Sequence, residues 1–403
     1  MFFGIMKQII ISLLLFFPLT VQSLNLEQAT ERALLWSPVI KNIETDLQKI
    51  RLDRKLVGKM PNPAFDASFA PVTDRCCATT NYYGIRQIFE TAHKTRKRVE
   101  ITYASENVLH TSLSQAQIDL IAQVYHTFID CYMAQEIYAL KKELFVSSEE
   151  NYKRQKELAE NGRFTLFEDC QNHKEFSLAQ VELNKSRAVF ETKKRELAIL
   201  WGGTLDFNQL ELDDEPLEEI NYAQLESYVD SYPEVIKKEY QIKTLQKTLK
   251  LEKANAVPNV EIFAGVNTCS SFHRSNLEMG FTVPLPIYQQ NQTMIGKVKL
   301  EIQDAIYELQ ALKAKIKSEL ESAHILYYQI HLPSVEIMKR TYLVAKHALE
   351  EMEVMKDSLC FEECVKAKKH FYDISIQFFH AKSEALHAKV NLLKLLNRCE
   401  GDE

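Results

Sequence analysis

Apolar side chains recur along two long stretches of the chain with the spacing of an α-helical seam. In both stretches they follow one another at intervals of three and four residues, and in the second the rhythm lasts for four heptads. This pattern predicts long helices that pack as a coiled coil, and an ordinary long helical bundle is the alternative that periodicity alone leaves open. The positions are Ile118, Ile121, Tyr125, Phe128 and Tyr132, then Ala367, Phe371, Ile374, Phe378, Ala381, Ala385, Ala388, Leu392 and Leu395.

Glycine and proline are nearly absent from these stretches. Neither occurs between Lys97 and Glu160, and after Gly296 the only exceptions are Pro333 and Gly401. Because both residues interrupt helices, their absence predicts runs of about 60 helical residues, each on the order of 90 Å long. Such a helix is longer than a small domain is wide, so the sequence predicts a rod or a tube.

Four shorter stretches alternate between apolar and polar side chains with a period of two. Residues 65–69 and 81–89 form the first predicted β-hairpin, and residues 260–267 and 277–285 form the second. One apolar and one polar face are typical of transmembrane β-strands, in which lipid-facing and lumen-facing positions alternate. The alternative is two solvent-facing hairpins packed on helices.

The two halves of the chain share the same order of predicted elements. Pro38 and Pro233 are 195 positions apart, and the same offset relates Pro63 to Pro258. Each half therefore predicts a short helix, a second helix that begins at a proline, a β-hairpin and a long helical hairpin, which is typical of a tandem repeat. The predicted boundaries are 24–203 for the first structural repeat, 204–220 for an acidic linker and 221–403 for the second repeat. The β-hairpins are placed at about 64–90 and 259–286, and the tips of the long helical hairpins at about 161–166 and 356–361.

Residues 1–23 predict a signal peptide for export. Lys7 precedes an apolar run from Ile9 to Leu19 that Pro18 interrupts, and Ser23 ends a small-residue cleavage pattern. The run is too short for a membrane-spanning helix, and a buried N-terminal helix is the alternative.

In a membrane, four strands cannot close a barrel, so the predicted sheet requires several copies of the chain, and three copies would supply 12 strands.

Composition argues against several classes of function. The net charge is −6 with both signs mixed along the chain, which argues against a dedicated nucleic-acid-binding protein. The sequence contains no nucleophile elbow, zinc-protease motif, phosphate-binding glycine loop or paired CxxC. We therefore expect neither an enzyme nor a cofactor. The 11 histidines form no ligand cluster along the chain, so they predict no metal site.

Several stretches are similar to the TolC-like family of outer-membrane efflux proteins. Residues 24–41 (LNLEQATERALLWSPVIK) resemble the family's opening helix and proline, and residues 280–305 (GFTVPLPIYQQNQTMIGKVKLEIQDA) resemble its fourth strand and the return into a long helix. Residues 85–98 (IRQIFETAHKTRKR) resemble the matching junction in the first half. Leu332 and Pro333, inside a predicted long helix, resemble a feature of the cation-efflux branch of the family.

The resemblance implies a mainly α protein with a small β part. Tandem-duplicated long helical hairpins would form an α-barrel, and four strands per chain would contribute to the 12-stranded transmembrane β-barrel of a homotrimer. The implied location is the cell outer membrane, with a long periplasmic extension. The implied partners are a periplasmic adaptor (a membrane fusion protein), an inner-membrane RND pump or ABC transporter, and outer-membrane lipid.

The sequence therefore predicts the outer-membrane channel of a tripartite efflux or type I secretion system, a passive gated exit duct. An exported coiled-coil scaffold or surface rod without channel activity is the alternative. The transported substrate stays open between metals, drugs and proteins, because one fold serves many functions.

The tips of the two long helical hairpins are predicted to contact the adaptor. The first half keeps the glycine and hydroxyl-containing turn that the family often carries, whereas the second half has Asp357 where glycine is expected. Two plain helix–helix turns are the alternative. The residues are Gly162, Phe164 and Thr165 at the first tip, and Ser358 and Leu359 at the second.

Two glutamates predict an acidic pore aperture. Glu168 and Glu363 lie just after the two tips and are again 195 positions apart, and Glu363 falls where the resemblance places an acidic aperture residue. In a trimer they would give six carboxylates near the narrowest point, which would attract cations and repel one another. A solvated glutamate on a helix is the alternative.

A basic cluster lies where the second predicted strand passes into a helix. It is predicted to contact anionic lipid headgroups, and a solvated helix start is the alternative. The cluster consists of His93, Lys94, Arg96, Lys97 and Arg98.

The cysteines lie in three places. Cys76 and Cys77 lie in the first hairpin loop and Cys269 in the second, where a disulfide between the loops is feasible after export. Cys170 lies near the first tip, and Cys360 and Cys364 lie near the second. These three are expected to be buried or free thiols, with a soft-metal site as the alternative.

Overall fold

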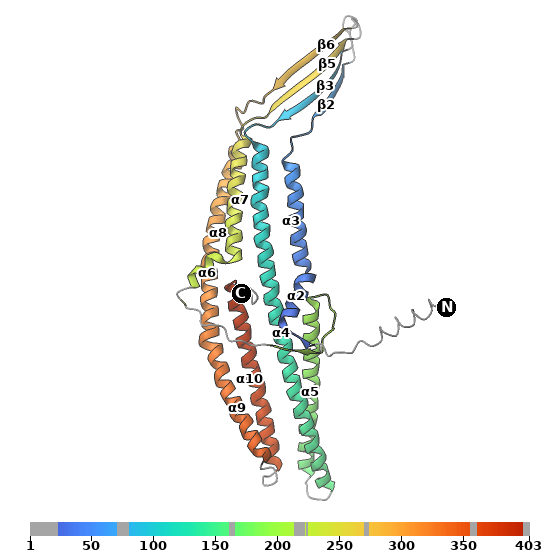
Figure 1. Ribbon diagram of the computed structural model, residues 1–403, viewed down its shortest axis with the longest axis vertical. Helices are drawn as coiled ribbons and strands as arrows, with labels where there is room; N and C mark the ends of the chain where they lie inside the picture. Colours follow the sequence, from blue (N-terminus) through green and yellow to red (C-terminus); the bar gives the residue numbers. More distant parts are fainter. Residues whose placement is uncertain are drawn as a thin grey trace, which may run out of the picture. The chain divides into compact units, whose positions relative to one another are not determined.

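The computed structural model describes residues 23–70, 80–160, 166–212, 222, 225–269, 274–354 and 361–397. Most of these residues are helical, with a few strands (Figure 1), which confirms the predicted mainly α fold with a small β part. The elements are β1 (Ser23–Leu24), α2 (Leu26–Trp36), α3 (Pro38–Val57), β2 (Ala64–Ala70), β3 (Thr80–Phe89), α4 (Lys94–Glu160), α5 (Leu166–Ile199), β4 (Gln209–Leu210), α6 (Leu225–Ser231), α7 (Pro233–Asn255), β5 (Val260–Cys269), β6 (Arg274–Thr282), α8 (Gln292–Ile325), η2 (Leu326–His331), α9 (Leu332–Val354) and α10 (Phe361–Leu395).

Two compact units divide the chain. Unit 1 takes the described residues of Met1–Pro38, Gln117–Leu225 and Ser318–Glu403, and unit 2 takes those of Val39–Ala116 and Glu226–Lys317. Each unit thus contains segments from both predicted repeats, because the long helices α4 and α8 contribute to both units. The repeat and linker boundaries stay a prediction, and the predicted signal peptide lies outside the described residues except for Ser23, which pairs with Gln209.

The duplication is visible in how the helices begin. Pro38 is the first residue of α3 and Pro233 the first residue of α7. Proline suits this position because the first residue of a helix has no intrahelical partner for its N–H, and the ring already holds a helical φ. The helices that follow the tips, α5 and α10, begin 195 positions apart, at Leu166 and Phe361.

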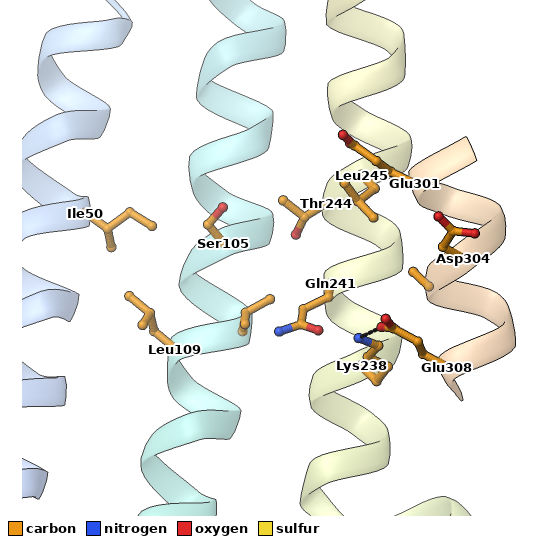
Figure 2. Close-up of a pocket in the computed structure, with 12 residues that line it drawn as sticks. Ile50, Ser105, Leu109, Lys238, Gln241, Thr244, Leu245, Glu301, Asp304 and Glu308 are labelled. Atoms are coloured by element: carbon orange, nitrogen blue, oxygen red, sulfur yellow. Dashed lines mark hydrogen bonds and ion pairs between the residues drawn. The ribbon is translucent and has the colours of Figure 1, made fainter. Parts of the chain in front are cut away.

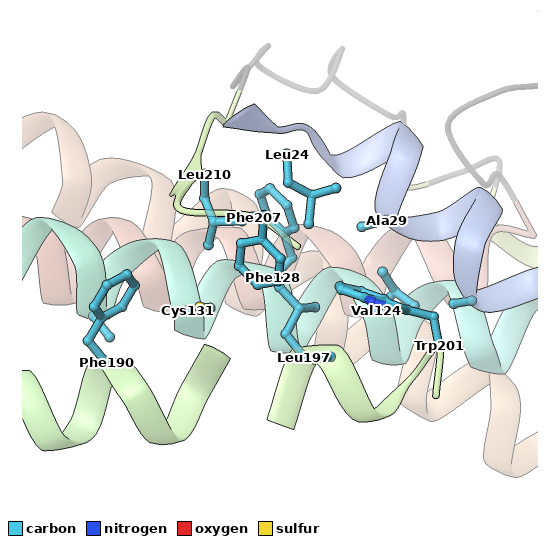
Figure 3. Close-up of a cluster of buried hydrophobic side chains, with 13 residues drawn as sticks. Leu24, Ala29, Val124, Phe128, Cys131, Phe190, Leu197, Trp201, Phe207 and Leu210 are labelled. Carbon is cyan, nitrogen blue, oxygen red and sulfur yellow. The ribbon is translucent and has the colours of Figure 1, made fainter. Parts of the chain in front are cut away.

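Unit 1 is built around the C-terminal part of α4. One face of α4 packs Val124, Phe128 and Cys131 against α2, α5 and the segment around Phe207 (Figure 3). Another face packs Ile129 and its neighbours on α4 against α10. Because α4 buries apolar side chains on two faces, the single predicted seam describes only part of its packing. The second face consists of Ala122, Ile129 and Met133 on α4 with Leu386 and Val390 on α10.

A π-helical turn, η2, precedes Pro333. Leu332 donates its backbone N–H to the carbonyl of Tyr327, five residues earlier, instead of four. Proline has no N–H to donate and its ring would clash with the carbonyl four residues before it, so a wider turn relieves both problems. The Leu332–Pro333 pair therefore sits at the end of a π-turn inside an otherwise continuous helical segment.

Unit 2 carries a four-stranded antiparallel sheet in the order β2-β3-β5-β6. The two hairpins come from the two halves of the chain and lie side by side through β3 and β5, so that Ile85 pairs with Ala264 (Figure 1). The four strands confirm the strand content predicted from the alternating stretches. In the part of the chain that the structure describes, no helix is both apolar and long enough to span a bilayer.

Candidate functional site

One face of the four-stranded sheet is apolar and exposed. Phe65 pairs with Ile85, Ile85 with Ala264, and Ala264 with Met279, so these four side chains share a face. Six large apolar side chains on this face are 60–74% exposed, from Ile85 (60%) to Phe281 (74%). A contiguous apolar patch of this kind marks a surface that another molecule or a membrane covers. Its exposed members on these strands include Phe65, Phe69, Ile85, Leu277, Met279 and Phe281.

The opposite face of the sheet carries polar and charged side chains together with Ile88 and Phe263. Arg86 on β3 forms ion pairs with Asp66 on β2 at 2.8 Å and with Glu261 on β5 at 3.3 Å. Asn267 on β5 donates a hydrogen bond to Glu278 on β6. The sequence places Arg86 on the polar face, but its partners depend on strand register and on the β3–β5 pairing, which the sequence pattern does not determine.

The predicted basic cluster lies at the junction from β3 to α4. Ala92 and His93 adopt left-handed backbone conformations (φ 54° and 56°), which turn the chain from strand into helix. Lys94 is 5% exposed, and its Nζ donates to the carbonyl of Val257 at 2.6 Å and to Oδ1 of Asn259 at 2.5 Å. Burial lowers the pKa of Lys94 from its ordinary value. Lys94 thus connects the start of α4 to the segment between α7 and β5.

The other members of the cluster differ in their exposure. Arg98 donates to Glu90 at 2.8 Å, and this hydrogen bonding lowers the pKa of the Glu90 carboxyl. Lys97 donates to the carbonyl of Ala92. The Arg96 side chain is 78% exposed and lies 3.5 Å from Glu100. Contact with lipid headgroups stays a prediction for the cluster, and Arg96 is the member best placed to make it.

The predicted aperture residues occupy equivalent places in their helices. Glu168 is the third residue of α5 and Glu363 the third residue of α10. Their side chains lie outside the described part of the structure, so the ring stays a prediction. The predicted tip residues Gly162, Phe164, Thr165, Ser358 and Leu359 also lie outside the described residues.

The predicted disulfide stays untested as well. Cys76 and Cys77 lie outside the described residues, and Cys269 is the last residue of β5, with its side chain outside the described part. Of the described cysteines, Cys131 is buried in the core of unit 1 and Cys170 is exposed, and both are free thiols. Burial raises the pKa of Cys131 to about 12.

A groove of about 700 Å³ opens between four helices of unit 2 (Figure 2). Its apolar lining includes Ile50 on α3 and Leu109 on α4, while α8 contributes carboxylates. Lys238 on α7 forms an ion pair with one of them, Glu308. The groove therefore combines an apolar floor with an acidic side, and the sequence pattern gave no sign of it.

Two histidines that the sequence separates by 261 positions meet in unit 1. Nδ1 of His126 on α4 lies 2.6 Å from Nδ1 of His387 on α10. Nε2 of His387 lies 2.9 Å from Asp130, and this hydrogen bond lowers the pKa of the Asp130 carboxyl. Across the described residues, no group of three histidine, cysteine or acidic side chains is arranged to hold a metal ion. Sequence reasoning missed the pair because only helix packing brings the two rings together.

Solved structures resemble the chain over almost its whole length. A membrane protein from Pseudomonas aeruginosa matches 93% of this chain and 92% of its own, with a TM-score of 0.76 and 12% identity. The outer-membrane channel OprN matches 93% and 90%, with a TM-score of 0.74 and 14% identity. The CmeC outer-membrane channel of Campylobacter jejuni matches 94% and 87%, with a TM-score of 0.74 and 14% identity. The chain has the TolC-like channel fold.

Sequence comparison adds one relative to the TolC-like fold. The cobalt-zinc-cadmium resistance protein CzcC of Cupriavidus metallidurans is 22% identical over 217 residues, which are 50% of this chain and 49% of that protein. The alignment thus spans about half the length of the curated relative. No protein-family model matches the chain. Together the comparisons confirm the resemblance to TolC-like proteins.

Proposed function

We propose that the chain is the outer-membrane exit duct of a tripartite efflux or type I secretion system. The two-faced sheet is the observation that supports this most strongly. A sheet with an exposed apolar face and a face that carries Arg86, Asp66 and Glu261 suits a wall between lipid and water. A rod in water would leave the apolar face uncovered.

The edges of the sheet support oligomerisation. Among the described strands, β2 and β6 each pair with one neighbour only. Unpaired backbone groups in lipid cost several kcal/mol each, so both edges require partner strands. Three copies would close 12 strands, and the helices would continue as an α-barrel into the periplasm.

The substrate class we propose is a metal cation. The support is the alignment with a protein named for cobalt, zinc and cadmium resistance. In this proposal the chain works passively, and a periplasmic adaptor and an inner-membrane RND pump or ABC transporter supply specificity and energy. The tip residues Gly162, Phe164, Thr165, Ser358 and Leu359 would contact the adaptor.

The aperture follows from the two equivalent glutamates. Glu168 and Glu363 lie in the first turns of α5 and α10, next to the tips. In a trimer, six carboxylates at a constriction would raise the local concentration of cations and favour opening through mutual repulsion. The proposed gate therefore combines selectivity for cations with a tendency to open when the carboxylates are ionised.

Planar-bilayer conductance of the detergent-purified protein tests the proposal. We expect small, cation-selective openings, and a loss of selectivity in the Glu168→Gln, Glu363→Gln double variant. A matched control is the Glu175→Gln, Glu336→Gln double variant, which removes two exposed carboxylates farther along α5 and α9. Unchanged selectivity in the first variant would remove the aperture from the proposal and keep the channel.

Fractionation separates the channel from a scaffold or surface rod. A channel is expected in the outer-membrane detergent fraction as a heat-resistant oligomer. A protein that stays soluble, forms no trimer and gives no conductance would establish the rod instead.

A further inference from the structure

The rings of His126 and His387 meet edge to edge. Their Nδ1 atoms are 2.6 Å apart, their centroids are 4.9 Å apart and their planes differ by 22°. The centroid distance exceeds the nitrogen distance by about the radii of the two rings, so both nitrogens lie close to the line between the ring centres. The in-plane orbitals of the two Nδ1 atoms therefore point at each other.

The second nitrogen of each ring faces an oxygen acceptor. Nε2 of His387 lies 2.9 Å from Oδ1 of Asp130, and an ionised carboxylate can only accept a hydrogen bond. Nε2 of His126 lies 3.1 Å from Oδ1 of Asn391, which is also an acceptor. With both rings neutral and each donating its Nε2–H to these oxygens, a neutral imidazole has no second N–H, so each Nδ1 is left with a lone pair.

We propose that this His126–His387 pair binds one divalent transition-metal ion of the class that prefers imidazole nitrogen, such as Zn²⁺, Co²⁺ or Cu²⁺. Two lone pairs at this distance repel each other unless a cation lies between them. Metal-binding histidines donate their other N–H to a carboxylate or carbonyl oxygen, which fixes the tautomer, and Asp130 and Asn391 occupy these positions. The pair thus has both the ligand atoms and the outer shell of a metal site.

A rotation of both side chains makes room for the ion. At a metal–nitrogen distance of about 2.0–2.1 Å in a tetrahedral site, two ligand nitrogens are about 3.3 Å apart. The nitrogens must therefore separate by roughly 0.7 Å from their 2.6 Å spacing, and each ring must turn by about 35° so that its lone pair points at the ion instead of at the other ring. Both side chains are partly exposed, so they can move without disturbing the buried core.

The surrounding charges are compatible with a bound cation. Lys193 on α5 pairs with Asp130 and Glu196, and Lys394 on α10 pairs with Asp119. Each nearby ammonium group is thus held by a carboxylate. Since the described residues offer no third histidine, cysteine or acidic ligand, water would fill the open positions. An open site exchanges its ion more readily than a closed structural site does.

Metal titration of the full-length, detergent-purified protein tests the site, and its outcome does not depend on channel activity. The protein is prepared without a polyhistidine tag, stripped with a chelator and titrated with Co²⁺ and Zn²⁺. The variants are His126→Gln, His387→Gln and Asn391→Ala, with His347→Gln as the matched control because that histidine is 72% exposed and belongs to α9.

We expect one site per chain that is lost in His126→Gln and His387→Gln and kept in His347→Gln. Asn391→Ala, at an exposed position, is expected to keep the stoichiometry and weaken binding about tenfold. Equal titrations of the wild type and His126→Gln would overturn the proposal, and so would an equal loss in His347→Gln.

Electron paramagnetic resonance of bound Cu²⁺ gives a second readout that needs no variant. Coupling to two equivalent nitrogens in the wild type supports the site. Coupling to one nitrogen or none would overturn it, and the two rings would then share only a proton.

Discussion

The ring of Phe263 on β5 lies over the α-carbon of Gly280 on β6, its direct partner in the sheet. A Cβ at position 280 would come within 2.5 Å of the ring, so only glycine fits there without displacing the aromatic side chain. An aromatic ring that covers a cross-strand glycine fixes the register of the two strands.

Gly280→Ala is therefore expected to lower the free energy of unfolding by about 1–3 kcal/mol, because it overpacks the pair. Urea denaturation of the detergent-solubilised protein measures this. Gly296→Ala is the matched control, since nothing lies within 4 Å of a Cβ there, and it should be neutral or stabilising. Equal stability of Gly280→Ala and the wild type would show that the ring moves away freely.

Lys94→Met is expected to destabilise unit 2 by about 1–3 kcal/mol, because it leaves the Val257 carbonyl and Asn259 without their buried donor. Arg96→Gln, at an exposed position, should leave stability unchanged and weaken salt-dependent binding to vesicles with anionic lipid. Thermal unfolding and vesicle sedimentation measure the two effects. If Lys94→Met weakened vesicle binding and left stability unchanged, Lys94 would bind lipid and its buried hydrogen bonds would not stabilise unit 2.

Glu106 on α4 gives an expected pH dependence of stability. Hydrogen bonds from Arg51 and Arg54 on α3 lower the pKa of Glu106 from 4.5. A lowered pKa in the folded state stabilises the protein above pH 4.5, and this contribution is lost as the pH falls through the folded-state pKa. Wild type should therefore melt at a higher temperature than Glu106→Gln at pH 7, and the difference should shrink on acidification. A difference that stayed constant with pH would point to packing, such as Arg54 over the Tyr103 ring, as the cause.

The two described free cysteines should differ in reactivity. With a pKa of about 12, only about one Cys131 side chain in ten thousand is a thiolate at pH 8, and the core covers it. Cys170 is exposed. Iodoacetamide labelling followed by mass spectrometry should modify Cys170 in the native protein, and Cys131 only after unfolding. Labelling of both at one rate would mean that the core around Cys131 opens readily.

Arg86→Gln tests whether the charged face of the sheet lines the pore. The change leaves Asp66 and Glu261 without their shared cation, so a pore lined by this face should become more selective for cations. Reversal potentials in planar bilayers measure this, and Arg86→Lys, which keeps the charge, is the control. Unchanged selectivity in Arg86→Gln would place this face away from the ion path.

The local sequence pattern was enough to predict the helices and strands, but it could not predict which of them pack together. The prolines at 38 and 233 and the alternating stretches each act through neighbours in the chain, so helix starts and strands could be predicted from them. The pairing of β3 with β5 joins residues such as Tyr83 and Val266 from different halves, and no local signal specifies it. The burial of Lys94 was missed because a run of basic residues is typical of a solvated surface. Its partners Val257 and Asn259 lie in the other half of the chain.

The strand order has a consequence for stoichiometry. The four strands alternate in direction, so β2 and β6 at the two edges of the sheet run opposite ways. In the proposed oligomer, β6 of one copy would therefore meet β2 of the next in an antiparallel pair, whatever the number of copies. The sheet by itself therefore accepts a ring of any size. In the proposed homotrimer, side-chain packing between helices of neighbouring subunits would therefore set the angle between the subunits, and with it the number of copies. A change of subunit number should be sought among helix-packing mutations and not among strand mutations.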